Sequence, residues 1–239
     1  MTQMSVQEYV AMQPKLTWRR RLMRAWMRAT FRLFATITVT GMENLPASGG
    51  TIIMMNHISL LDPILCMATI KPRFVVPMTK VENMRNPLLA PFIRFWGSYS
   101  VNRGEVDRTA LTNSVEMIKS GAMILIAPEG TRQREGLSRP KDGMAYVATK
   151  ADAIIVPAAI SGARDWMRNL THFKRSHIHI HYGRAFKFKT DGRARIPRDE
   201  LAAMTEEAMY QLAAAVSDTS MRGLYSDLSQ STTDHLTFL

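Results

Sequence analysis

The feature that most constrains the fold is an alternation of short apolar, β-rich runs with helical patterns, beginning at about residue 35. The predicted strands are residues 35–40, 51–55, 74–77, 122–127, 153–160 and 177–182. The predicted helices are residues 60–70, 106–119, 141–150 and 197–216. Because such alternation is typical of βαβ units, we predict an α/β domain with a largely parallel central sheet flanked by helices.

The remaining segments lie on either side of this alternating region. A chain of 239 residues with 46% apolar composition can bury one substantial core. We therefore expect one α/β domain at residues 35–216, preceded by a helical segment at residues 1–34. Residues 217–239 are rich in Ser, Thr and Asp, and we expect them to be loosely ordered.

The N-terminal segment carries much of the positive charge. The chain has 31 Lys and Arg against 20 Asp and Glu, a net charge of +11, and no acidic residue lies between Glu8 and Glu43. At helical spacing four arginines form one stripe, and a broad apolar side includes Leu22, Trp26 and Leu33; the stripe is Arg20, Arg24, Arg28 and Arg32. Two interpretations stand: an amphipathic helix that contacts an anionic membrane, which we favour, or one packed on the domain with its arginines in solvent.

Charge, cysteine content and hydropathy limit the partners and the cellular location of the protein. The charge leaves nucleic acid, anionic lipid and phosphorylated substrates open as partners. Cys66 is the single cysteine, so an intramolecular disulfide and cysteine zinc sites are excluded, and a reducing compartment is indicated. We find no secretory signal and no run of roughly 18 apolar residues. We therefore expect a peripheral or monotopic protein on the cytoplasmic face of the cell membrane.

The first candidate site follows the predicted strand 51–55 and reads Asn-His-Ile-Ser-Leu-Leu-Asp-Pro from Asn56 to Pro63. Ligands of open α/β sheets bind at the carboxyl ends of strands, so His57 is a candidate base and Asp62 its orienting carboxylate. We expect His57 to lie in the turn before the helix and to look back at Asp62. The alternative is a helix start, with Asp62 as N-cap, Pro63 at the first helical position and Ser59 in a capping box.

Two further segments carry polar residues after apolar runs. Glu129, Gly130, Thr131 and Arg132 follow the strand 122–127, where Arg132 can bind a phosphate and Glu129 a hydroxyl. An ordinary exposed turn is the competing interpretation. Arg103, between a short β-like run and a helix, is a second phosphate-binding candidate.

Taken in order, these segments together with residues 156–162 resemble the glycerolipid acyltransferase superfamily, of the lysophosphatidic acid acyltransferase type. Asn-His-x-x-x-x-Asp matches at Asn56, His57 and Asp62, and Pro-Glu-Gly-Thr-Arg matches at residues 128–132. The usual Lys-x-Gly appears at residues 141–143. Three residues differ from the usual residues of the family motifs: Asn102 stands where Asp is frequent, Ala127 replaces Phe and Gln133 replaces Ser. These differences bear on the choice of acceptor more than on catalysis.

The resemblance implies roles for these residues. His57 is then the general base and Asp62 orients it; the glycerophosphate acceptor is bound by Arg103, Glu129, Gly130, Thr131, Arg132 and Lys141. The acyl group comes from acyl-CoA or acyl-ACP as co-substrate, so acyl carrier protein is a further candidate partner. The implied product is phosphatidic acid, made from lysophosphatidic acid for phospholipid biosynthesis.

Several alternatives and exclusions complete the prediction. Another lysolipid, such as a lyso-aminolipid or lysophospholipid, is an alternative acceptor, and a non-enzymatic basic protein that binds membrane or nucleic acid is a second class. The acyl chain requires an apolar groove, for which residues 84–96 are a candidate lining or else a core helix. His177, His179 and His181 share one strand face, but without matching carboxylates or cysteines we expect no metal site and no cofactor. If the protein is an acyltransferase, we expect no nucleic-acid partner.

Overall fold

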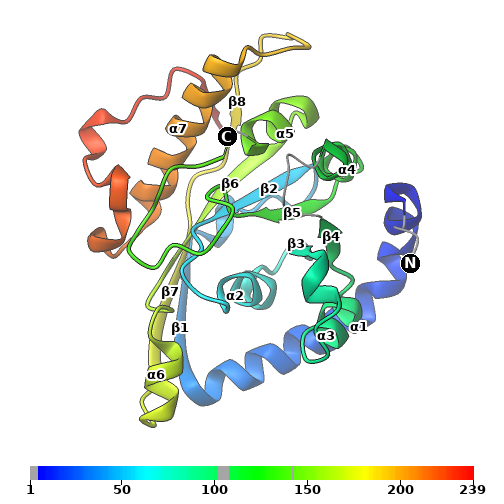
Figure 1. The fold of residues 1–239 in the computed structure, drawn as a ribbon, viewed down its shortest axis with the longest axis vertical. Coiled ribbons are helices and arrows are strands. Elements are labelled where there is room, and N and C mark those ends of the chain that lie inside the picture. Colours follow the sequence, from blue (N-terminus) through cyan, green and yellow to red (C-terminus); the bar gives the residue numbers. More distant parts are fainter. Residues whose placement is uncertain (1–4, 102–107, 142) are drawn as a thin grey trace.

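The computed structural model describes residues 5–101, 108–141 and 143–239. Its centre is a mixed sheet in the strand order β1-β7-β6-β2-β5-β3-β4, and β8 and β9 continue it beside β6 (Figure 1). The strands are β1 Ala35–Thr40, β2 Thr51–Met55, β3 Val75–Lys80, β4 Tyr99–Val101, β5 Met123–Ile126, β6 Ile154–Ser161, β7 Ser176–Tyr182, β8 Phe186–Phe188 and β9 Leu236–Phe238. The α/β prediction is confirmed. The block β6-β2-β5-β3-β4 is parallel, whereas β7 and β8 pair antiparallel with β6, so the sheet as a whole is mixed.

Helices cover both faces of this sheet. The helices are α1 Val6–Phe34, α2 Asp62–Thr69, α3 Ala90–Trp96, α4 Arg108–Lys119, α5 Gly143–Ala151, α6 Trp166–Thr171 and α7 Arg198–Ala215. Figure 1 shows α1, α2 and α3 on one side and α4, α5 and α7 on the other. Every residue of β2 and β5 is buried, because both faces of these strands are covered. Parallel strands buried in this way are almost entirely apolar. Continuous apolar runs therefore mark the centre of the sheet.

The predicted strands and helices are all present, with ends that differ by a few residues. The sequence patterns missed α6, β8 and β9, whereas α3 lies within residues 84–96, for which a core helix is one of the two predicted alternatives. The missed elements are only three to six residues long, too short to show a full period of either pattern. No helix in the described part of the chain is both long enough and apolar enough to cross a membrane.

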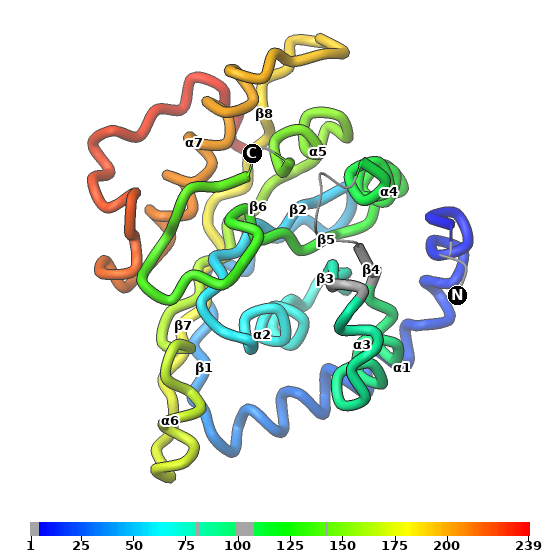
Figure 2. The backbone as a smooth tube through the Cα atoms, in the orientation of Figure 1, coloured from blue at the N-terminus to red at the C-terminus, as the bar shows by residue number. Residues whose placement is uncertain are grey.

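The C-terminal segment is folded, so its expected loose order is wrong. It forms the 3-10 helices η3 Thr219–Tyr225 and η4 Leu228–Gln230 before β9 pairs with β8, and Figure 2 traces it back along α7. Asp218 and Asp227 each accept a hydrogen bond from a backbone N–H two residues on. On α7, the Glu207 carboxylate accepts from the backbone N–H groups of Asp234 and His235, at 3.1 and 3.0 Å. The polar composition that indicated disorder thus serves turns and caps.

Most of the arginine stripe of α1 contacts the domain, so the interpretation that leaves these arginines in solvent is wrong. Arg20 is buried, and its Nε donates to the Trp96 carbonyl at 2.8 Å. Arg24 donates to the Arg73 carbonyl at 2.9 Å, and Arg28 donates to the Ala68 carbonyl at 2.7 Å. Burial, assisted by the neighbouring Arg28 and Arg20, lowers the pKa of Arg24 to about 10. Three of the four stripe arginines therefore contact the domain and Arg32 is exposed, while the outer side of α1 exposes Trp18, Leu22, Trp26 and Leu33.

Candidate active site

Two turns at the carboxyl ends of β2 and β5 form the candidate site. These strands are parallel neighbours, with Met54 opposite Ile126, so His57 and Glu129 each lie three residues beyond a paired position. The backbone joins the two turns directly: Gln133 N–H donates to the His57 carbonyl at 2.7 Å. The strand pairing thus brings together two segments more than 70 residues apart in sequence.

His57 and Asp62 meet as the sequence predicts. The His57 Nδ1 lies 3.0 Å from Asp62 Oδ2, with His57 in the turn that precedes α2. The alternative helix start is wrong in detail, because α2 begins at Asp62 with Leu61 as its N-cap and no side-chain cap. Instead, Asp62 folds back into the turn and accepts from the N–H groups of Ile58 and Ser59, both at 2.7 Å.

This network selects one tautomer of the imidazole. Asp62 is fully buried, and this burial raises the pKa of its carboxyl, while the His57 hydrogen bond and the two backbone donors oppose the rise. An ionised Asp62 Oδ2 is an acceptor only, so Nδ1 of His57 carries the proton. The lone pair on Nε2 is then available as a base, and the His57 side chain is 19% exposed.

Glu129 is held inside the protein. It is 3% exposed, and one of its oxygens accepts from Ser138 N–H at 2.9 Å while the other accepts from His57 N–H at 3.4 Å. Burial raises the pKa of Glu129, and the Ser138 and His57 hydrogen bonds oppose it. This arrangement favours a role in joining the two turns over the predicted contact with a substrate hydroxyl.

The other predicted substrate-binding residues lie around the same turn. Gly130 has a φ of +73°, a left-handed conformation that favours glycine. A Cβ there would stand 3.0 Å from Cε of Lys141, so the lysine side chain lies over the turn. Thr131, Arg132 and Lys141 are exposed, and the first two border the same cavity as His57. Arg103 lies outside the described residues.

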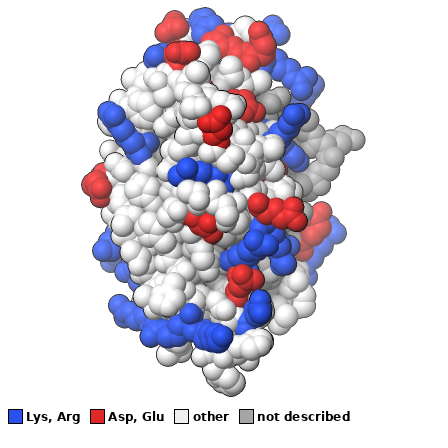
Figure 3. All heavy atoms as spheres, turned by 90° about the vertical axis from the view of Figure 1, so that its left-hand side faces the viewer, with Lys and Arg blue, Asp and Glu red and all other residues white. Residues whose placement is uncertain are grey.

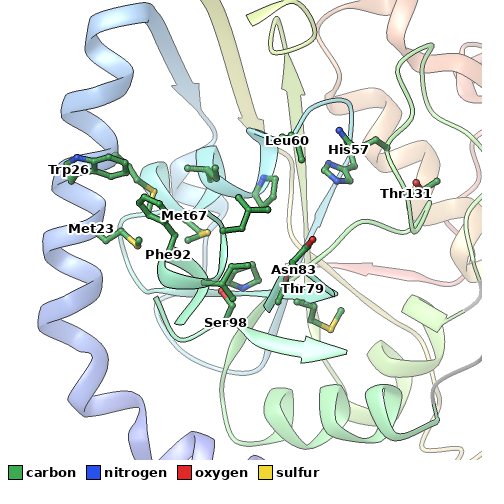
Figure 4. A pocket seen from close by; sticks show the side chains of 18 residues that line it. Met23, Trp26, His57, Leu60, Met67, Thr79, Asn83, Phe92, Ser98 and Thr131 are labelled. Carbon is green, nitrogen blue, oxygen red and sulfur yellow. The ribbon is translucent and has the colours of Figure 1, made fainter. Parts of the chain in front are cut away.

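A cavity of about 500 Å³ opens beside His57. Figure 4 shows His57 and Thr131 on one side of it and Met23 and Trp26 of α1 on the other. Its walls are mostly apolar; the polar side chains among them are His57, Thr79, Asn83, Ser98, Thr131 and Arg132. The cavity thus joins a polar end that holds a base to an apolar end that suits a hydrocarbon chain.

The predicted apolar lining at residues 84–96 is part of this cavity. Leu89, Phe92 and Ile93 border it, whereas Trp96 is fully buried in the core, so the segment serves both of the alternatives considered. Sequence patterns missed the contribution of α1, which supplies Met23, Trp26 and Met27. Only the tertiary packing of α1 over α2 and α3 reveals it.

Two other candidates take no part in the site. Cys66 is fully buried, and burial raises the pKa of its thiol, as expected of a core residue. His179 Nε2 and His181 Nδ1 lie 3.0 and 2.9 Å from the Thr40 hydroxyl. Within the described ranges no three His, Cys, Asp or Glu side chains are arranged to hold a metal ion.

Comparisons with known proteins find similar 1-acyl-sn-glycerol-3-phosphate acyltransferases. A 1-acyl-sn-glycerol-3-phosphate acyltransferase of Borreliella burgdorferi is 30% identical, and the match covers 67% of this chain and 66% of that protein. The protein of the same name from Bacillus subtilis is 28% identical over 57% of this chain and 68% of its own length. The matched region thus leaves about a third of each relative outside it.

A solved structure shares the fold. The 1-acyl-sn-glycerophosphate acyltransferase PlsC of Thermotoga maritima superposes with a TM-score of 0.64 over 92% of this chain and 83% of its own, at 18% identity. The acyltransferase family model matches residues 36–161, a range that contains His57, Asp62 and the turn at Glu129. With more than half of its length matched, this chain belongs to the acyltransferase family.

Proposed function

We propose that this enzyme transfers a fatty acyl group from a thioester, acyl-CoA or acyl-ACP, to the free hydroxyl of lysophosphatidic acid, giving phosphatidic acid. The observation that carries the proposal is the His57–Asp62 pair, 3.0 Å apart, at the polar end of a largely apolar cavity. A base beside a hydrocarbon-binding wall is what acyl transfer to an alcohol requires.

The reaction needs one base and no acyl-enzyme intermediate. Nε2 of His57 removes the proton of the acceptor hydroxyl as that oxygen attacks the thioester carbonyl carbon. The carbon–sulfur bond then breaks, the new ester is released, and the proton passes from Nε2 to the departing thiolate. Asp62 keeps Nδ1 protonated and stabilises the imidazolium that forms in between.

The acceptor phosphate has candidate partners beside the base. Arg132 borders the cavity next to His57, and the Lys141 side chain lies over Gly130 on the same turn. A guanidinium can bind a phosphate through two parallel hydrogen bonds, which would hold the neighbouring hydroxyl near Nε2. Arg103 is proposed as a further phosphate ligand. The names of the relatives support lysophosphatidic acid over other lysolipids.

We also propose that the exposed side of α1 contacts the membrane. Trp18, Leu22, Trp26 and Leu33 are between 53% and 80% exposed, and Trp26 stacks on Phe92 of α3, which is also exposed. Apolar and aromatic side chains on an amphipathic helix insert into the interfacial region of a bilayer. An enzyme lying on the cytoplasmic face would then receive its lipid acceptor through the wall formed by α1 and α3.

The test is thiol release together with lipid product formation by the purified protein. Lysophosphatidic acid is offered with acyl-CoA or acyl-ACP, and lysophosphatidylcholine serves as the alternative acceptor. We expect phosphatidic acid and stoichiometric thiol with at least one donor, and a rate at least about 10³-fold lower from His57→Ala at an unchanged melting temperature. Turnover retained by His57→Ala would refute the base, and turnover only with lysophosphatidylcholine would refute the acceptor.

A further inference from the structure

A second exposed apolar surface lies far from α1 in sequence, on α6 and the turn that follows it. Met167 and Leu170 are 54% and 42% exposed, and Phe173 is fully exposed. Their spacing of three residues places them on one side of the short helix and its extension. We call these three residues the α6 patch.

Phe173 is unfavourable for the folded protein in water. It follows the C-cap residue His172 and has a φ of +54°, a left-handed conformation in which glycine or asparagine is the usual residue. The turn is closed by backbone bonds from Phe173 N–H to the Leu170 carbonyl and from Lys174 N–H to the Asn169 carbonyl. A large aromatic side chain here is strained and buries nothing, so folding alone does not explain its presence.

The charge around the α6 patch indicates what covers it. Between residues 164 and 175 the basic side chains are Arg164, Arg168, Lys174 and Arg175, and Asp165 is the single acidic one. All five are exposed. Figure 3 shows Lys and Arg gathered near the lower end of the molecule, where Figure 1 places α6, above an uncharged tip. Apolar side chains surrounded by basic ones match the chemistry of an anionic lipid surface.

The α6 patch also adjoins the exposed end of α1. The rings of Phe34 and Trp166 lie 6.2 Å apart, and Arg175 donates to the carbonyls of Arg32 and Ala35, at 2.8 and 3.0 Å. Leu33, next to this junction, is 80% exposed. Figure 1 shows α6 and the C-terminal end of α1 at the same end of the molecule.

We propose that the α6 patch is a second membrane contact, inserted among anionic headgroups beside the C-terminal end of α1. One helix on a bilayer leaves the protein free to rotate about the helix axis, whereas a second contact fixes its orientation. The opening of the cavity is thereby held at a constant angle to the lipid surface. The inference extends the proposed contact of α1, and its test does not depend on turnover.

The first test places a probe at the patch. Cys66 is fully buried, so a thiol-reactive, environment-sensitive fluorophore on Phe173→Cys labels that position selectively. We expect a blue-shifted emission and loss of quenching by iodide when vesicles containing phosphatidylglycerol are added. A label that stays quenchable on vesicles to which the protein is bound would overturn the proposal. Shielding that grows with protein concentration without vesicles would also overturn it, because the surface would then be a protein contact.

A matched label on Leu224→Cys serves as the control. Leu224, in η3, is 63% exposed and belongs to the C-terminal segment, away from α6. We expect it to remain quenchable by iodide on the same vesicles. Equal shielding at both positions would show adsorption without a fixed orientation and would contradict the proposal.

The second test separates folding from membrane binding. Because glycine relieves the left-handed strain, we expect Phe173→Gly to raise the melting temperature slightly. We expect the same change to weaken binding to phosphatidylglycerol vesicles by about tenfold, as loss of one buried aromatic side chain implies. Unchanged vesicle affinity would contradict the proposal. Thiol release with detergent-dispersed lysophosphatidic acid, measured on the same variant, reports separately on the proposed function.

Discussion

The two ends of the cavity are built in opposite ways. At the polar end His57, Asp62 and Glu129 are connected by hydrogen bonds within two turns, and each side chain has one defined position. At the apolar end Met23 and Trp26 of α1 and Phe92 of α3 line the cavity without hydrogen bonds to one another, and the rings of Trp26 and Phe92 stack. Directional bonds hold a reacting group in place, whereas an apolar wall accepts any chain of suitable length.

The comparison implies that changes at the polar end act on catalysis and changes at the apolar end act on selectivity. Asp62→Asn should produce the largest effect among the variants that leave His57 in place. An amide keeps an acceptor for Ile58 and Ser59 N–H but no longer stabilises a charged imidazole, so we expect kcat to fall about 10²- to 10³-fold. Steady-state thiol release measures it. A loss of less than about threefold would mean that Asp62 serves only the turn.

Arg132→Ala tests the proposed phosphate contact. Loss of a charge-assisted pair should raise KM for lysophosphatidic acid about 10- to 100-fold, with a smaller change in KM for the thioester. Arg134→Ala is the matched control, because Arg134 is exposed two residues further on and does not border the cavity. If the two variants raise KM equally, Arg132 acts only through its positive charge and the specific phosphate contact is contradicted.

Met23→Phe sharpens the comparison from the apolar side. Figure 4 shows Met23 across the cavity from His57, so a bulkier side chain should shorten the space for the acyl chain. We expect the preference among thioesters to shift several-fold toward shorter chains, with kcat for the best donor nearly unchanged. Leu22→Phe, on the exposed side of the same helix, should leave the preference as it is.

Glu129→Gln should have a small effect on turnover. Because Gln retains an oxygen for Ser138 N–H, we expect kcat to change by about tenfold or less. Burial raises the pKa of Glu129 in the folded protein, so the native state holds this proton more tightly than the unfolded chain does. The unfolding free energy of the wild type should therefore fall, relative to the variant, as pH rises from the ordinary glutamate pKa toward the folded value. Denaturant melts across that range measure the difference; the opposite slope would contradict the assigned burial.

The sequence predicted the polar end well and the apolar end poorly, for a physical reason. His57 and Asp62 are five residues apart, and each turn follows a buried strand, so local pattern and strand-end rules place them. The apolar wall of the cavity depends on which side of α1 packs against α2 and α3, and no local sequence pattern determines this orientation.

The arginines of α1 show this limit most clearly. A stripe of charge normally indicates solvent or headgroups, yet Arg20, Arg24 and Arg28 donate to backbone carbonyls of the domain. Every residue has a backbone carbonyl, so the sequence does not indicate which one an arginine side chain reaches. The same reason explains the C-terminal segment, where Glu207 on α7 accepts from backbone N–H groups nearly 30 residues away.

The most direct test of the central claim, that His57 and Asp62 act as one catalytic unit, is a double-mutant cycle on thiol release. The four proteins are the wild type, His57→Ala, Asp62→Asn and the double variant. If Asp62 acts through the imidazole, the double variant should be no slower than His57→Ala alone. If the two losses instead multiply, Asp62 contributes independently of His57, and the paired mechanism is contradicted.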